Sequence, residues 1–187
     1  GKAFMAAGLQ PFQAVNIIGF NTTEWIIADL GAIAAGGIAA GMYTTNAPDA
    51  CQYVAGHSDA AVVVCQGKKQ LEKLLEVQKD LPALKALVVY DYVPTDEDKA
   101  KVQVPVHGWA DFMALGKDVP DADIEKRIAD QKPNQCCTIL LGKPSAGNNT
   151  IMGVRILTLP ARGTLYQFGD ALKYNSYLTQ FDATTAV

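Results

Sequence analysis

The sequence predicts an α/β fold, in which a mainly parallel sheet is flanked by helices. Continuous apolar runs bounded by polar residues, such as residues 60–65, are typical of strands that are buried on both faces. Amphipathic segments lie between these runs, and residues 68–81 show the clearest helical periodicity, with leucines on one face and Lys and Glu on the other. Strands that alternate with helices indicate a parallel, doubly wound sheet.

The first half of the chain predicts this alternation element by element. Residues 1–8 read as the end of a helix, with Gly8 as its C-terminal cap. Asn21 is expected to cap the next helix, with Glu24 reaching back to it three residues later. The expected order is helix 1–8, strand 14–20, helix 21–36, strand 38–43, helix 47–57, strand 60–65, helix 68–81 and strand 84–90.

The second half is less regular. Residues 93–105 are polar and predict a solvated loop. The remaining expected elements are helix 109–115, helix 121–131 and strand 136–141. Helical periodicity is absent after about residue 150, where aromatic residues and short strand-like pieces alternate with Pro and Gly. We therefore expect a domain over residues 1–150 and a β-rich or irregular tail over residues 151–187.

Composition excludes several classes of protein. With 187 residues, 49% of them hydrophobic and 19% charged, the chain is not intrinsically disordered. A net charge of −3 argues against a nucleic-acid partner. The longest apolar stretch, residues 26–42, contains Asp29 and four glycines and is too short for a membrane span. The chain opens without an initiator Met, as if inside a helix, so we expect a fragment.

The cysteines and histidines predict no metal or catalytic site. The four cysteines form no C-x-x-C pair, and we interpret them as reduced core thiols in a cytoplasmic protein, with disulfides as the less favoured alternative. Two histidines beside them make a zinc site improbable. Packing or a helix end explains these residues better than nucleophilic or acid–base catalysis. They are Cys51, Cys65, Cys136, Cys137, His57 and His107.

Several segments, in order, carry a resemblance to a known family. Residues 15–25 read VNIIGFNTTEW, residues 41–48 read GMYTTNAP, and residues 53–58 read YVAGHS. Residues 69–73 (KQLEK) and 132–137 (KPNQCC) add two further matches. Over about residues 1–141 the chain resembles the N-terminal region of long-chain acyl-CoA synthetases, members of the adenylate-forming superfamily, and most of all their bubblegum subgroup.

The resemblance implies an ATP-dependent ligase and a partial AMP-binding domain over residues 1–150. Such enzymes join a fatty acid to AMP and then transfer the acyl group to coenzyme A. ATP with Mg²⁺ and coenzyme A are therefore the implied cofactor and co-substrate, and a fatty acid is the implied partner. The implied location is the cytoplasm, with peripheral contact to intracellular membranes left open.

The resemblance also places the phosphate-holding loop after the strand at residues 136–141. The family pattern there reads YTSGTTGNPKG, whereas residues 141–151 read LGKPSAGNNTI. Aligned without gaps, Ser145 matches the first hydroxyl of the Thr pair, and Gly147 and Asn148 match the Gly-Asn that follows. These three residues are the candidate remnant of a phosphate loop; no catalytic residue and no metal ligand is assigned.

Three departures argue against a working loop. Ala146 lacks the second hydroxyl, and Pro144 replaces a Gly, which fixes φ and removes an N–H donor. Thr150 stands where the family has the Lys that faces the phosphates. The family's later adenine-binding motifs and its C-terminal catalytic Lys are not in this sequence. We therefore expect an incomplete portion of the ligase that is inactive by itself.

Two other functions stay open. The chain could be a non-catalytic binding or scaffold module that keeps the fold and has lost the ligase chemistry. It could also be a fusion with an adhesion-type repeat, since residues 159–166 (LPARGTLY) faintly resemble a turn of bacterial cadherin-like repeats. A spliced or frame-shifted end is an equal explanation of the tail.

Overall fold

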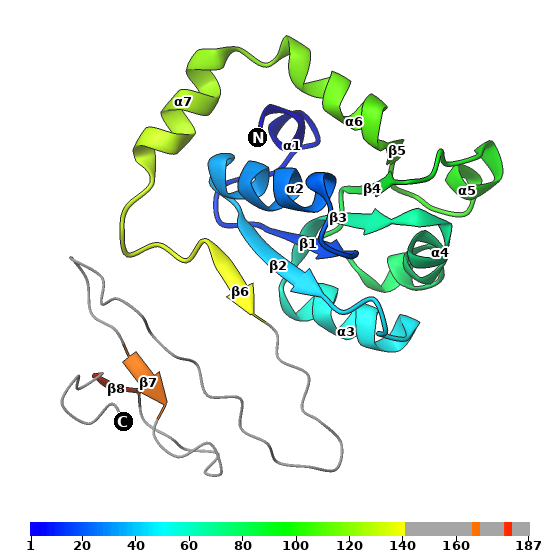
Figure 1. Cartoon of the computed structure of the whole chain (residues 1–187), viewed down its shortest axis with the longest axis horizontal. Coiled ribbons are helices and arrows are strands. Elements are labelled where there is room, and N and C mark those ends of the chain that lie inside the picture. The colour runs from blue at the N-terminus through cyan, green and yellow to red at the C-terminus, as the bar shows by residue number, and fades with distance from the viewer. Residues whose placement is uncertain (141–165, 169–177, 181–187) are drawn as a thin grey trace. The chain divides into compact units, whose positions relative to one another are not determined.

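The computed structural model describes residues 1–140, 166–168 and 178–180 of the chain. Residues 1–131 and 136–140 build a six-stranded sheet with its helices, and the described tail residues build a two-stranded pair, which is treated by itself (Figure 1). The helices are α1 (Lys2–Ala6), α2 (Thr23–Ala34), α3 (Pro48–His57), α4 (Gly67–Val77), α5 (Asp96–Ala100), α6 (Trp109–Leu115) and α7 (Asp121–Asp130), with 3₁₀ turns η1 (Gln78–Asp80) and η2 (Gly116–Asp118). The strands are β1 (Ala14–Ile18), β2 (Ile38–Met42), β3 (Ala60–Gln66), β4 (Ala86–Tyr90), β5 (Val106–Gly108), β6 (Thr138–Leu140), β7 (Tyr166–Phe168) and β8 (Leu178–Gln180).

The large sheet is parallel throughout and has the order β5-β4-β3-β1-β2-β6. β1 lies at its centre, with Ala14 opposite Ile38 of β2 and Ile18 opposite Cys65 of β3. The sequence placed β1, β3 and β4 correctly, because every residue of these strands except Gln66 is buried, which is how a strand covered on both faces reads. The predicted α/β class with a mainly parallel sheet is confirmed.

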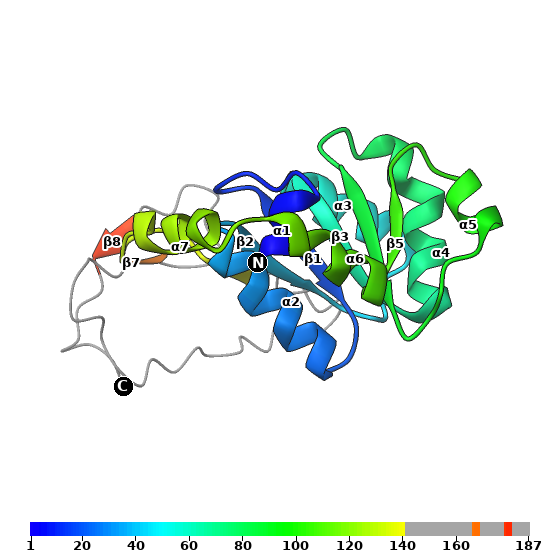
Figure 2. The ribbon, with the colours of Figure 1, turned by 90° about the horizontal axis from the view of Figure 1, so that it is seen from above.

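Helices cover both faces of the sheet. On one face α1, α2 and α6 pack their small and aromatic side chains against the strands, and Phe4 meets Phe112 edge-on at 4.9 Å between ring centroids. On the other face lie α3 and α4 (Figure 1). They pack against the sheet through Cys51, Leu71 and Leu74. Seen from above, α6 and α7 carry the chain from β5 back across the sheet (Figure 2). The core therefore consists of two apolar layers with the sheet between them.

The start of α2 differs from the prediction. Thr22, not Asn21, is the N-cap, and its hydroxyl accepts a hydrogen bond from the backbone N–H of Trp25 at 3.2 Å. Asn21 was the wrong choice because the capping pattern looks only for a carboxylate three residues on. Packing fixes the phase of the helix instead, since Ala28 and Ala32 must face the sheet.

The connector over residues 93–105 is not only a solvated loop. It contains α5, which is capped by a reciprocal pair between the Thr95 and Asp98 side chains and backbones. Asp98 is 2% exposed and also accepts a hydrogen bond from the Tyr92 hydroxyl at 2.7 Å. β5 was missed as well, and it places His107 in a strand rather than a loop. A polar composition hid both elements, because neither is long enough to show a period.

The other predicted elements lie close to their expected positions. Gly8 and Gly36 follow α1 and α2 with φ of 89° and 79°, so both helices end at a glycine. β6 is an edge strand and begins at Thr138, two residues later than predicted. In the tail, β7 pairs with β8 in antiparallel fashion, with Tyr166 opposite Gln180, and the rest of the predicted β-rich or irregular tail lies outside the described residues. No helix in the described ranges has the length and apolar character needed to cross a bilayer.

Candidate functional site

The carboxyl edge of the large sheet is the candidate site. In open α/β sheets, ligands bind beyond the carboxyl ends of the strands, where two neighbouring strands send their connections to opposite faces. β1 leads into α2 on one face, and its neighbour β3 leads into α4 on the other. The topology therefore places the switch point, where such ligands bind, beside the ends of β1 and β3.

Gln66, the last residue of β3, forms hydrogen bonds with the segments that follow β1 and β4. The backbone N–H of Phe20 donates to Gln66 Oε1 at 2.8 Å, and Gln66 Nε2 donates to Asp91 Oδ2 at 2.8 Å. Asp91 has φ of 57°, so the backbone turns sharply at that position. These contacts fix the geometry of the edge before any ligand is present.

Gly19 and Tyr90 lie in close contact next to Gln66. A Cβ atom at Gly19 would lie 2.0 Å from the Tyr90 hydroxyl and 3.0 Å from Gln66 Cβ. That hydroxyl is buried and has no hydrogen-bond partner among the described residues. Burial raises the pKa of Tyr90, although Thr22 acts in the opposite direction. Only glycine fits here, because the tyrosine oxygen fills the space that a side chain needs.

On the other side of β1, α4 holds the turn after β2. Lys73 Nζ donates to the carbonyl oxygens of Thr44 at 2.9 Å and Asn46 at 2.7 Å. Gln70 Nε2 donates to the same Thr44 carbonyl at 3.2 Å, while its Oε1 is buried and has no hydrogen-bond partner in the part of the chain that the structure describes. The Lys73 ammonium is thus directed at backbone carbonyls and acts as a structural clamp. Lysine is placed there by the predicted amphipathic pattern of the helix.

β6 leads from this edge toward the predicted phosphate loop. It runs parallel to β2, and Leu140 lies opposite Gly41. The Thr138 hydroxyl donates to the Ala39 carbonyl at 3.0 Å and supports the pairing. Residue 141 therefore follows a strand that ends at the carboxyl edge. The predicted residues Ser145, Gly147 and Asn148 lie outside the described residues, so their contacts stay a prediction.

The histidines do not form an acid–base pair with any neighbour that the structure records. His57 is exposed at the end of α3 and stacks on Tyr53 at 5.8 Å between ring centroids. His107 lies in β5 near Phe112, and burial lowers the pKa of its imidazole. Within the described part of the chain, no three His, Cys, Asp or Glu side chains form a group that could hold a metal ion.

The cysteine interpretation is correct for two residues and wrong for the other two. Cys51 and Cys65 are fully buried, and burial raises the pKa of both thiols. Cys136 and Cys137 are exposed and are not core thiols. The apolar run that follows them forms β6, which is an edge strand. An edge strand pairs with a neighbouring strand on one side only, and its other side stays open.

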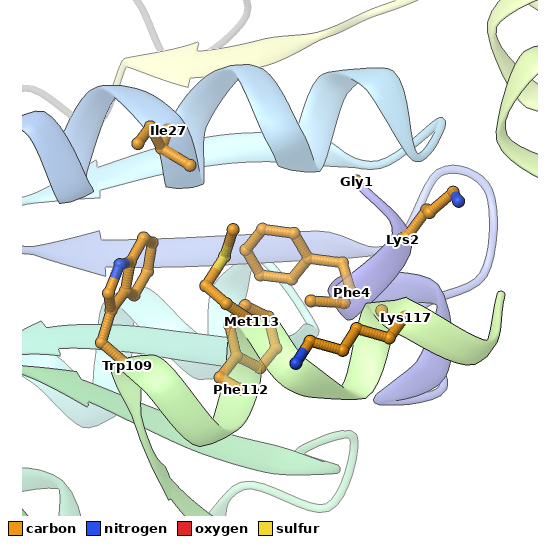
Figure 3. A pocket seen from close by; sticks show the side chains of 10 residues that line it. Gly1, Lys2, Phe4, Ile27, Trp109, Phe112, Met113 and Lys117 are labelled. Atoms are coloured by element: carbon orange, nitrogen blue, oxygen red, sulfur yellow. The ribbon is translucent and has the colours of Figure 1, made fainter. Parts of the chain in front are cut away.

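A second hollow lies on the helical side that carries α1, α2 and α6 (Figure 3). It encloses about 330 Å³, and most of its lining is apolar. Lys2 adds charge to the lining and pairs with Asp121. The lining offers no carboxylate, histidine or thiol, so it can take an apolar group but not perform chemistry on one. Its side chains include Phe4, Ile27, Trp109, Phe112, Met113 and Lys117.

The residues at the β1–β3–β4 edge were missed by the sequence analysis. Gln66, Tyr90 and Asp91 end or follow buried strands, and Gly19 follows β1. The usable signal was the first polar residue after each apolar run, because in a parallel sheet such residues meet at one edge. The contact between Gln66 and Asp91 has no counterpart in any local pattern, since the two residues are 25 positions apart.

Comparison with known proteins decides the family. Residues 1–141 match the sequence profile of the family described as AMP-binding enzyme. The chain belongs to this family. It is 46% identical over 147 residues to a long-chain-fatty-acid–CoA ligase, ACSBG2, of Xenopus laevis, a match that covers 78% of this chain and 19% of that protein. It is 40% identical to ACSBG1 of Homo sapiens, with 79% of this chain and 20% of that protein covered.

The resemblance to bubblegum-type ligases is thereby confirmed, and the chain spans about a fifth of the length of these relatives. Solved structures support the fold. The adenylation domain of a carboxylate reductase from Mycobacterium chelonae superposes with a TM-score of 0.55 at 19% identity, over 64% of this chain and 20% of that one. A carboxylic acid reductase domain from Segniliparus rugosus, solved with AMP and a carboxylic acid, gives 0.52 at 18% identity, over 74% and 24%.

Proposed function

We propose that this chain supplies part of the AMP-binding domain of an ATP-dependent ligase for long-chain fatty acids. The whole enzyme would form a fatty acyl adenylate with release of pyrophosphate, and would then pass the acyl group to coenzyme A. The names of the relatives support the substrate class, and residues 1–141 support the family. We place the protein in the cytoplasm, with a partial AMP-binding domain over residues 1–150 and a divergent tail over residues 151–187.

One observation carries the second half of the proposal, that the chain by itself is inactive. The family match ends at residue 141, where β6 has just delivered the chain to the edge of the sheet. The segment that follows has Pro144 and Thr150 where the family has a Gly and a Lys. Backbone N–H groups and a Lys are what hold a triphosphate, and both substitutions remove such donors.

The cofactors follow from the family. ATP with Mg²⁺ is the proposed nucleotide, and coenzyme A is the proposed acceptor. Mg²⁺ in such sites is bound through substrate phosphates and one or two carboxylates. Residues 1–140 contribute no group of three possible metal ligands. The proposal therefore assigns no metal ligand to the described residues, and it keeps Ser145, Gly147 and Asn148 as the phosphate contacts.

Activity is tested directly. The purified chain is incubated with ATP, Mg²⁺, palmitate and coenzyme A, and AMP release is measured beside a full-length bubblegum-type ligase as positive control. We expect no release above a buffer blank. Turnover by the isolated chain would show that it carries a complete site. Calorimetric titration with ATP separates a weak remnant loop, which binds nucleotide, from a scaffold module that does not.

Restoring the loop tests the reason for inactivity. The double variant Pro144→Gly/Thr150→Lys regains a backbone donor and a cation for the phosphates, and each charge-assisted hydrogen bond contributes roughly 1.5–3 kcal/mol. We expect the affinity for MgATP to rise at least about tenfold, measured by calorimetry. Ser176→Lys, which adds the same charge in the tail, is the matched control. Equal gains in both variants would mean that charge alone, and not the loop, binds the nucleotide.

A further inference from the structure

The four cysteines divide into two pairs with opposite surroundings. Cys51 and Cys65 are 0% exposed in the core layer that α3 and α4 cover. Cys136 and Cys137 are adjacent in sequence, and both are exposed at the start of β6. The chain thus presents two neighbouring thiols to solvent, while its other two thiols are shielded and provide an internal reference.

The backbone of the exposed pair is fixed in place. The Ala39 N–H donates to the Cys137 carbonyl at 2.9 Å, and the Thr138 hydroxyl donates to the Ala39 carbonyl at 3.0 Å. The Cys136 thiol donates to the Thr138 carbonyl at 3.4 Å, so its side chain bends toward the C-terminal side, where Cys137 lies. The two residues directly precede β6, and the pairing of the Cys137 carbonyl with Ala39 orders the backbone there, which lowers the entropy cost of holding a ligand.

Geometry restricts what the pair can do. Adjacent Cα atoms are about 3.8 Å apart across a trans peptide bond, whereas disulfides usually join Cα atoms about 4.4–6.8 Å apart. Direct closure of Cys136 onto Cys137 would therefore be strained and easily reduced. Zinc prefers four protein ligands, and the described residues supply no third donor to this pair. A thiophilic metal or metalloid atom that binds only two sulfur atoms and bridges them avoids the strained disulfide and needs no third donor.

We propose that Cys136 and Cys137 form a two-thiol site for a trivalent arsenical. Two arsenic–oxygen bonds of an organoarsenous acid break and two arsenic–sulfur bonds form. Each thiol proton leaves with one oxygen, so two molecules of water are released and neither arsenic nor sulfur changes oxidation state. The bridging atom enlarges the ring by one member and relieves the strain of a direct disulfide. This inference rests on the exposed thiols and not on ligase activity.

The full chain is treated with one equivalent of phenylarsine oxide under reducing-agent-free native conditions, and intact mass and peptide mapping are recorded. We expect one phenylarsenic group per chain, on the peptide that contains Cys136 and Cys137, and loss of alkylation at both residues. A small dithiol should release it and a monothiol should not. Cys136→Ser and Cys137→Ser should each weaken binding at least about 100-fold, because the second bond is then no longer intramolecular.

Cys51 and Cys65 serve as the matched control in every sample. In a folded chain they should resist alkylation until urea is added, which also shows that the serine variants fold. The proposal is overturned if either single variant binds the arsenical as tightly as the parent chain. It is equally overturned if the arsenical maps to Cys51 or Cys65, or if the exposed pair is alkylated no faster than the buried pair in the native chain.

Discussion

The contact between Gly19 and Tyr90 shows how one side-chain oxygen can dictate a glycine. No positive φ is involved at Gly19; the restriction is the tyrosine hydroxyl 2.0 Å from the position of a Cβ. Since this hydroxyl has no hydrogen-bond partner within 3.5 Å among the described residues, its removal should cost little stability. A local sequence pattern contains neither fact, because Gly19 and Tyr90 come from different strands.

A double-mutant cycle tests this contact. Gly19→Ala should destabilise the chain by about 1–3 kcal/mol through overpacking. Tyr90→Phe should change the free energy of unfolding by less than about 0.5 kcal/mol, since no hydrogen bond is lost. The double variant should recover part of the alanine penalty, although the ring carbon at 3.0 Å remains. Urea unfolding measures all four chains, and strictly additive effects would contradict the contact.

Asp98 makes the stability of the chain depend on acid. The Tyr92 hydroxyl, the Thr95 backbone N–H and the Thr95 hydroxyl donate to it, and these bonds lower the pKa of the carboxyl to about 2 from 3.8. A lowered pKa in the folded state stabilises the chain above pH 3.8, and this contribution is lost as the pH falls toward 2.

The variant Asp98→Asn tests the acid effect. Wild type should exceed the variant in stability by about 1 kcal/mol near pH 6, and the difference should shrink between pH 4 and pH 2 as Asp98 takes up its proton. Unfolding by urea over this pH range measures it. Asp96→Asn, which removes an exposed carboxyl from the same helix, is the control and should leave the pH dependence of the unfolding free energy nearly unchanged. If the stability difference between wild type and Asp98→Asn stayed constant from pH 6 to pH 2, Asp98 would be excluded as the cause of the acid dependence.

At the scale of elements, α7 is held by polar bonds together with the partial packing of Ile124 against the core. None of its residues is buried. Arg127 Nη1 donates to the carbonyl oxygens of Leu9 at 2.8 Å and Ala35 at 3.0 Å, and Gln131 Nε2 donates to the Ile33 carbonyl at 2.8 Å. Two of these acceptors lie at the end of α2: the Ile33 carbonyl already accepts from the Gly36 N–H at 2.8 Å, and the Ala35 carbonyl lies beyond the last turn, where helix carbonyls lack intrahelical partners.

Removal of this attachment should free α7 and leave the sheet intact. In Arg127→Ala, hydrogen exchange over residues 121–131 should accelerate at least about tenfold, because a local opening that costs a charged hydrogen bond becomes easier by roughly 1.5 kcal/mol. Exchange in β1 and β3 should stay slow. Lys126→Ala is the matched control, since the pairing recorded for Lys126 among the described residues is with Asp130, inside the helix. Similar acceleration in both variants would show that helix propensity, not the Arg127 bonds, holds α7.

Elements with a long, regular pattern were predicted well, and short ones were not. α4 buries Leu71, Leu74 and Leu75, which are the leucines that defined its pattern. α5 and β5 have five and three residues, too few to repeat a period; α5 is held by its local Thr95–Asp98 capping box, and β5 depends on pairing with β4. Thr22 replaces Asn21 as a cap for a similar reason, because contact with the sheet sets where α2 begins.

For the whole molecule, the sequence predicted the layered α/β class but not the strand order. Apolar runs identify strands that are buried on both faces, yet nothing local says that β6 joins β2 at the edge opposite β5. The candidate site follows the same division. Its loop was found from a family resemblance, whereas Gln66, Tyr90 and Asp91 became neighbours only through the order of strands.

The strand order also has a consequence for biosynthesis. β2 to β5 each add beside a strand that precedes them in the chain, so the sheet can grow outward from β1 as the chain emerges from the ribosome. β6 must wait until α6 and α7 have crossed to the far side, and its pairing with β2 closes a long loop. Until then the open side of β2 is the part of the nascent chain most exposed to a wrong strand, and a chaperone that shields it would act before translation ends.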